Sequence, residues 1–282
     1  GGFAFMHDLV RSAIVDGIPA DRQRLMHRQL ALAAEQLRVR SPRDGAPSSA
    51  SIAEHWELGG EPARAVPHRL AAAEAALAVF EDATVEAHWM QAAADGAGLA
   101  ERVAIAWGRA KLRRNRDDAP GLDQSVIELD ALAAEAGDYP DTAAAGLDAR
   151  IHAADVLSLM QRSAASLQRI NQVLQMLAAA ASAGQPDAVD DASRRRLATA
   201  WLVRSQALNG LGRATEGMQA AKQALSCGGL TVAQQGRAFH SLVYGHFTRN
   251  ELAEARACAE RSLALWQSVG ERRLMARAHG NL

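Results

Sequence analysis

Apolar residues recur at helical spacing along most of the chain, and this pattern limits the fold more than any other feature. The runs step by three or four residues, which places one apolar face along a helix of 3.6 residues per turn. The clearest runs are Val66, Leu70, Ala73, Leu77 and Phe80; Leu122, Val126, Leu129, Ala133 and Ala136; Leu167, Ile170, Leu174, Leu177 and Ala181; and Phe239, Leu242, Val243, His246 and Phe247. Hydrophobic residues make up 49% of the chain but aromatic residues only 4%. Because the apolar content is mostly Ala and Leu, the composition favours helix and argues against a large sheet.

Glycine and proline divide these runs into pieces about one helix long. They fall at Gly59-Gly60, Gly96, Pro120-Gly121, Gly137, Pro140, Gly184, Pro186, Gly212, Gly228-Gly229 and Gly270. Such residues stop and start helices, and short links between helices imply antiparallel neighbours. The one long loop predicted is Arg40–Ser49, which is rich in Pro, Gly and Ser.

Two segments near the C-terminal end repeat each other. Ala198–Gly229 aligns with Gly236–Gln267 at a constant offset of 38 residues, which places Trp201 on Phe239 and Gly212 on Asn250. Each copy reads as a helix, a tight turn and a second helix with small residues. Upstream, Leu99–Asp138 and Asp141–Gly184 are each predicted to form a further helical pair.

This repeat resembles the tetratricopeptide (TPR) repeat, whose signature places an aromatic residue and Leu-Gly in the first helix. The match is divergent: Arg204-Ser205 and Leu242-Val243 stand where Leu-Gly is usual, and the terminal proline is absent. The resemblance implies an all-α fold, a right-handed superhelix (α-solenoid) of antiparallel TPR-like hairpins. Gly270–Leu282 reads as a first helix without its partner, so we expect the array to be truncated at its C-terminus.

The beginning of the chain has a different pattern. Phe3 and Phe5 alternate as in the last strand of a small sheet, and a short helix over Leu9–Ile14 is predicted after them. Pro19 suits the first turn of the next helix. For that helix the spacing predicts an apolar stripe of Met26, Leu30, Ala33 and Leu37.

This segment resembles a junction in STAND-type signalling ATPases, where a winged-helix module meets helical repeats. The matching residues are Phe5, His7, Asp8, Leu9, Val10, Arg11, Ala13, Pro19, Arg22, Met26, His27, Arg28, Leu30 and Ala31, followed by Ala53, His55, Trp56 and Gly59-Gly60. The resemblance extends over about Phe3–Phe80, and relatives include LuxR-type large ATP-binding regulators and bacterial transcriptional activators. It implies that residues 1–38 end a winged-helix-like module and linking helix, that 39–50 form a loop, and that 51–282 form the array. ATP, Mg²⁺ and DNA would then bind to domains outside these residues.

Composition and motifs exclude several functions. With 31 Lys+Arg and 32 Asp+Glu, the formal charge of −1 shows no basic excess for binding nucleic acid. We find no apolar run long enough to span a membrane and no signal peptide, and two cysteines suit a cytoplasmic protein. The chain has no P-loop, no metal-ligand spacing among its histidines and no catalytic motif. We therefore expect no enzyme activity, cofactor or metal in this chain.

Two arginine clusters each adjoin an acidic pair, which favours local neutralisation over phosphate binding. They are Arg113, Arg114 and Arg116, and Arg194, Arg195 and Arg196.

The concave groove of such an array is lined by first helices, so candidate binding residues lie there. On the first helix of the second copy, Arg237, His240 and Tyr244 lie off the apolar stripe and near one face. Their counterparts at the 38-residue offset are Thr199, Leu202 and Gln206. Arg, His and Tyr together suit an acidic or polar ligand. The alternative is that these are solvated surface residues.

Taken together, these features predict the sensor or interaction arm of a multidomain signal-transduction ATPase, a transcriptional regulator. Its groove would bind a protein segment or a small effector, and its own ATPase domain would be a further partner. The alternative is a stand-alone TPR adaptor with no ATPase domain. An all-α enzyme would need polar groups converging in a pocket, for which the sequence offers no motif.

Overall fold

A computed structural model of the chain describes residues 17–40, 46–79, 81–137, 139–183, 190–270 and 275, and all of the regular structure in these ranges is helical. The chain divides into two compact units, Gly1–Ile105 and Ala106–Leu282. The predicted strand at Phe3 and Phe5, the helix over Leu9–Ile14, and the turn at Gly184 and Pro186 lie outside the described residues. Of the helix predicted after Gly270, only Met275 is described.

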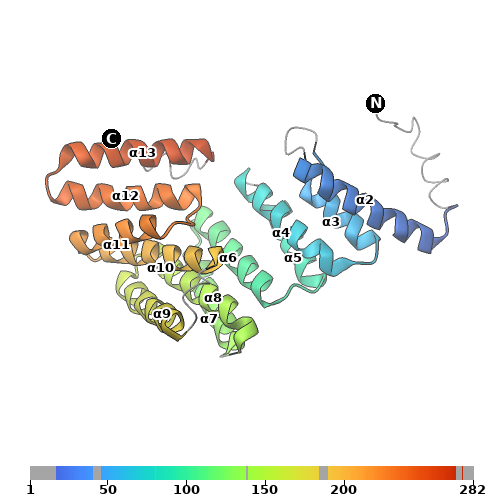
Figure 1. Cartoon of the computed structure of the whole chain (residues 1–282), viewed down its shortest axis with the longest axis horizontal. Helices are drawn as coiled ribbons and strands as arrows, with labels where there is room; N and C mark the ends of the chain where they lie inside the picture. The colour runs from blue at the N-terminus through green and yellow to red at the C-terminus, as the bar shows by residue number, and fades with distance from the viewer. Residues whose placement is uncertain are drawn as a thin grey trace. The chain divides into compact units, whose positions relative to one another are not determined.

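The first unit contains α2 (Ala20–Arg40), α3 (Ser49–Leu58), α4 (Pro62–Ala78) and α5 (Asp82–Ala94). The division between the units falls within α6 (Leu99–Asn115), and the second unit continues with α7 (Ala119–Ala136), α8 (Pro140–Leu159), α9 (Ser163–Ala183), α10 (Asp191–Gly210), α11 (Ala214–Cys227), α12 (Val232–Thr248) and α13 (Leu252–Ser268). From α7 to α13, consecutive helices lie alongside one another, as α12 and α13 do in Figure 1. The prediction of an all-α fold built from stacked helical hairpins is confirmed.

One tight turn recurs between the helices of five hairpins: α3–α4, α6–α7, α8–α9, α10–α11 and α12–α13. In each, a residue with positive φ is followed by one whose backbone N–H donates to the carbonyl five residues earlier, at 2.9–3.0 Å. The positive-φ residues are Gly60, Asp117, Gln161, Gly212 and Asn250. This is a Schellman-type helix end, which reverses the chain within three residues. The ends of α10 and α12 are 38 residues apart, and so are the beginnings of α11 and α13, as the sequence repeat predicts.

Buried serines join the two helices of three successive hairpins. The Ser166 hydroxyl on α9 donates to the Ala154 carbonyl on α8 at 2.7 Å. Ser205 on α10 donates to Gly217 on α11 at 2.8 Å, and Ser262 on α13 donates to Gly236 on α12 at 3.0 Å. Because each hydroxyl finds a carbonyl across the interface, it can be buried among alanines without an unpaired polar group.

The prediction for the apolar stripe of α2 is wrong. The face of α2 that packs on α3 contains Ala31, which is fully buried, and Ala34. Met26, Leu30 and Leu37 are between 42% and 48% exposed. Small residues form the interface because they let the two helices approach closely, and the larger side chains lie on another face of α2. On either side of the predicted loop, α2 ends at Arg40 and α3 begins at Ser49. Residues 41–45 between them lie outside the described residues.

Candidate functional site

Three of the six predicted positions line one groove in the second unit. Gln206 on α10 and His240 and Tyr244 on α12 contribute to a cavity of about 670 Å³. Its other lining residues are Ser158, Leu159, Gln161, Ser163, Asn209, Gly210, Ser241, Val243 and Phe247. The groove thus extends over the C-terminal halves of α8, α10 and α12, the first helices of three successive hairpins.

Arg237 lies beside this groove but is already paired. Its guanidinium donates to both carboxylate oxygens of Asp155 on α8, at 2.6 and 3.1 Å. The Arg237 side chain is 15% exposed and that of Asp155 only 3%. The same guanidinium donates to Gln206 Oε1 at 2.6 Å. Because its charge is balanced inside the protein, Arg237 is not presented to a ligand as the sequence reasoning assumed.

The contact with Arg237 fixes the orientation of the Gln206 amide. Its Oε1 accepts from the guanidinium, so Nε2 is the atom left to interact elsewhere. Among the described residues no acceptor bonds this Nε2. Gln206 therefore offers two N–H donors from a partly exposed position on the groove lining.

Asn209, one turn further along α10, is held differently. Its Nδ2 donates to the Ser241 carbonyl on α12 at 3.2 Å. Its Oδ1 is buried, and a Cβ added to Gly217 on α11 would stand 2.0 Å from it. The Asn209 Nδ2 is therefore engaged by α12, and the Gln206 Nε2 is the carboxamide donor of α10 that remains available to a ligand.

Ring side chains follow one face of α12. His240 lies against Trp266, with ring centroids 5.6 Å apart. Tyr244 is 41% exposed and Phe247 is 65% exposed. The sequence assigned Phe247 to the apolar core stripe, but of that run only Leu242 and Val243 are buried. The spacing of four and three residues brings the three rings to one side of the helix, over the groove.

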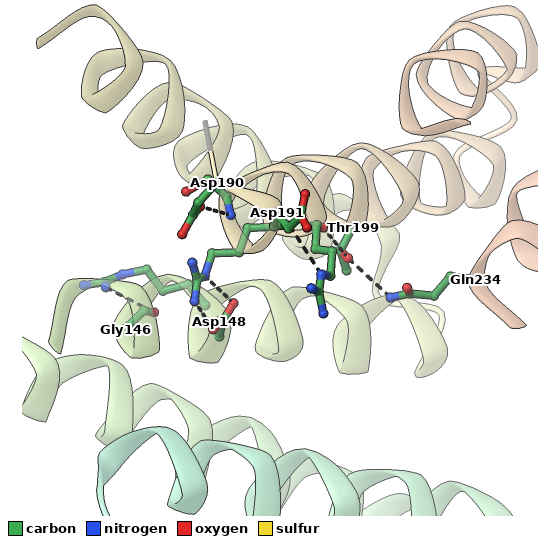
Figure 2. Close-up of polar contacts among 10 residues, drawn as sticks. Gly146, Asp148, Asp190, Asp191, Thr199 and Gln234 are labelled. Carbon is green, nitrogen blue, oxygen red and sulfur yellow. Dashed lines mark hydrogen bonds and ion pairs between the residues drawn. The ribbon is translucent and has the colours of Figure 1, made fainter. Parts of the chain in front are cut away.

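The other two predicted positions on α10 do not line the groove. The Thr199 hydroxyl donates to the Arg195 carbonyl at 2.8 Å and accepts from Gln234 Nε2 at 3.3 Å, as Figure 2 shows. Leu202 is fully buried in the core. Thr199 therefore contacts the N-terminal half of α12, away from the site formed by Gln206, His240 and Tyr244.

Sequence reasoning missed the polar face of α8. Asp148, His152 and Asp155 are spaced four and three residues apart, the signal that could have revealed it. Asp148 accepts from Arg196 of α10 at 2.9 and 3.0 Å, a pair that Figure 2 draws at the labelled Asp148. The His152 ring stacks on Trp107 of α6, with centroids 4.6 Å apart. Burial lowers the pKa of His152 from 6.5 to about 4, against the opposing effect of the two aspartates, so the ring is neutral.

In the first unit, residues from the two segments of the ATPase resemblance contact one another. His27 on α2 and His55 on α3 have their Nδ1 atoms 3.1 Å apart. Arg28 donates to the Gly59 carbonyl at 2.7 Å. Nearby, Trp56 Nε1 donates to Glu35 Oε1 at 2.8 Å. These contacts hold α2 on α3.

The first unit also contains a larger cavity, of about 1000 Å³. Its lining combines the segment 46–50 at the start of α3 and the alanines of α4 with Arg38, Val79, Glu81, Thr84 and His88. It contains none of the predicted binding residues.

Comparison with known proteins identifies no family. No protein-family model matches the chain, and no curated protein matches it. Among solved structures, the chain is similar to BtubC (BKLC) from P. vanneervenii, with 11% sequence identity and a TM-score of 0.47, covering 89% of this chain and 92% of that one.

Two further findings concern the described parts of the chain. None of their helices combines the length and the hydropathy needed to cross a bilayer. No group of three His, Cys, Asp or Glu side chains there is arranged to hold a metal ion.

Proposed function

We propose that this chain is the sensor or interaction arm of a multidomain signal-transduction ATPase, a transcriptional regulator, and that it binds a protein segment or small effector in the groove across α8, α10 and α12. The observation that carries the proposal is the groove itself. It combines the available amide of Gln206 with the exposed rings of Tyr244 and Phe247 on successive first helices. Its volume lies within the range of about 300–1,000 Å³ typical of ligand sites.

The assignment to a STAND-type ATPase rests on the junction residues of the sequence. Support comes from the contacts of His27 with His55 and of Arg28 with Gly59, which join the two matching segments into one packed element. In such a protein the arm would act by population shift. An effector that binds one arrangement of arm and ATPase domain more tightly than another would favour that arrangement.

The groove is tested by substitutions that leave the helices intact. Tyr244→Ala with Phe247→Ala removes both exposed rings, and Leu252→Ala removes an apolar side chain, whose exposure lies between those of the two rings, from α13 outside the groove. Partner capture by the full-length protein is expected to fall with the groove variant and to stay unchanged with Leu252→Ala. Equal losses in both variants would refute the groove as the site.

The reading frame around residues 1–282 distinguishes the ATPase arm from the stand-alone TPR adaptor. A P-loop encoded upstream supports the arm, and groove variants should then alter effector-dependent ATP hydrolysis by the full-length protein. If the frame encodes no nucleotide-binding domain, the adaptor replaces it as the function of the same groove.

A further inference from the structure

We propose that the groove across α8, α10 and α12 selects an extended peptide segment without charged side chains. This deepens the proposed function and rests on it, since it names the ligand class of the same site. The inference comes from the juxtaposition of an internally neutralised Arg237, an oriented Gln206 amide and two exposed rings on α12.

The lining has almost no charge. Of its twelve described residues none is Asp, Glu, Lys or Arg, and His240 is the sole titratable side chain besides Tyr244. Arg237 contacts the groove residue Gln206, and its positive charge is neutralised by Asp155. A ligand charge of either sign would lose its hydration in this groove without gaining an ionic partner from the lining, so the site penalises charge.

The donors of the lining suit a peptide backbone. Each residue of an extended peptide presents a carbonyl and, except for proline, an N–H group. Gln206 Nε2 offers N–H donors, because Arg237 already occupies its Oε1. The Tyr244 hydroxyl has no partner among the described residues and can both donate and accept. Two such groups on facing helices can hold a main chain in one register.

The rings define what the peptide carries. Tyr244 and Phe247 are 41% and 65% exposed and lie three residues apart on α12. Apolar rings in this position gain most when an apolar or aromatic side chain covers them. The preferred segment is therefore uncharged, with at least one large apolar residue flanked by residues that leave its backbone accessible.

The experiment uses the whole chain and two pools of N-acetylated, C-amidated hexapeptides. Both pools carry the same apolar residues; the polar positions are Asn, Gln or Ser in one and Asp or Glu in the other. Bound peptides are separated with the protein and quantified by mass spectrometry. We expect the uncharged pool to be enriched at least about tenfold over the acidic pool. Tyr244→Ala with Phe247→Ala should abolish the enrichment, and Leu252→Ala should preserve it.

A charge introduced into the groove provides the reciprocal test. Gln161 is exposed and lines the groove at the turn after α8, so Gln161→Lys adds a cation without touching the core. This variant should shift the preference toward the acidic pool. Preference of the unmodified chain for the acidic pool, lost on removing the rings, would overturn the selectivity but leave the groove as the binding site. Binding of neither pool would overturn both.

Discussion

Arg237 and Asp155 lie 82 positions apart in the sequence and form a nearly buried, two-point ion pair between α12 and α8. The pair reaches past α10, which contacts both of these helices. It therefore ties the first helices of three hairpins together, and it removes from the groove the one cation that the sequence offered to a ligand.

Loss of one partner should be costly at this position. In Asp155→Asn the guanidinium of Arg237 stays buried without its counter-charge, and we expect the free energy of unfolding to fall by about 3–5 kcal/mol. Asp123→Asn is a matched control, because Asp123 forms a similar two-point pair with Arg162 but is 46% exposed. There we expect a loss of about 1 kcal/mol or less. Urea unfolding of both variants measures the difference, and equal losses would contradict the role given to burial.

Glycine at position 236 is required by the packing of Trp266. A Cβ there would stand 2.3 Å from the Trp266 Nε1, and Trp266 is 1% exposed. Gly236→Ala should therefore destabilise the chain by about 1–3 kcal/mol, although alanine is the better helix former. In a Trp266→Leu background the clash disappears, and the same substitution should become neutral or stabilising. Thermal unfolding of the parent chain, the two single variants and the double variant tests whether positions 236 and 266 are coupled. If the two single effects simply add, the positions are not coupled.

Much of the fold could be predicted from the sequence, because helices and their pairing leave local signals. The spacing of apolar residues predicted the helices, and the offset of 38 residues predicted that Gly212 and Asn250 occupy equivalent turns, as their positive φ values confirm. The turn at Gln161 gave no such signal, since neither glycine nor proline lies near it in the sequence.

The site was only partly predictable, because its electrostatics depend on contacts between distant segments. Helical spacing selected His240 and Tyr244, the 38-residue offset added Gln206, and the structure brings the three to one groove. The ion pair of Arg237 with Asp155 depends on how α8 and α12 pack on α10. No local sequence pattern predicts that packing. The exposure of Phe247 was missed for a similar reason: its spacing fits the core stripe, but at the C-terminal end of α12 its side chain is 65% exposed.

The turn after α8 offers a way to stabilise the chain. Gln161 has a φ of 60°, in the left-handed region that costs a residue with a Cβ about 1–2 kcal/mol. Gln161→Gly should raise the free energy of unfolding by up to about 1 kcal/mol, since glycine also has more freedom to lose in the unfolded chain. Asn250 occupies the same conformation at the α12–α13 turn with a φ of 59°. Because asparagine tolerates this region better, Asn250→Gly should change stability less, and denaturant unfolding should rank the two variants in that order.

The neutral His152 predicts a loss of stability in acid. Its folded pKa of about 4 lies below the ordinary value of 6.5, so between these values the unfolded chain binds a proton that the folded chain does not. The contribution of His152 is therefore complete above pH 6.5 and is lost as the pH falls toward 4. Between pH 7.5 and pH 5 this one group should lower the free energy of unfolding by about 2 kcal/mol at most. His152→Gln cannot take up the proton, so its stability should fall less over the same interval. Urea unfolding at the two pH values, on both chains, isolates this difference from the other titrating groups, and parallel pH profiles would show that the stacked ring on Trp107 is freely protonated in the folded protein.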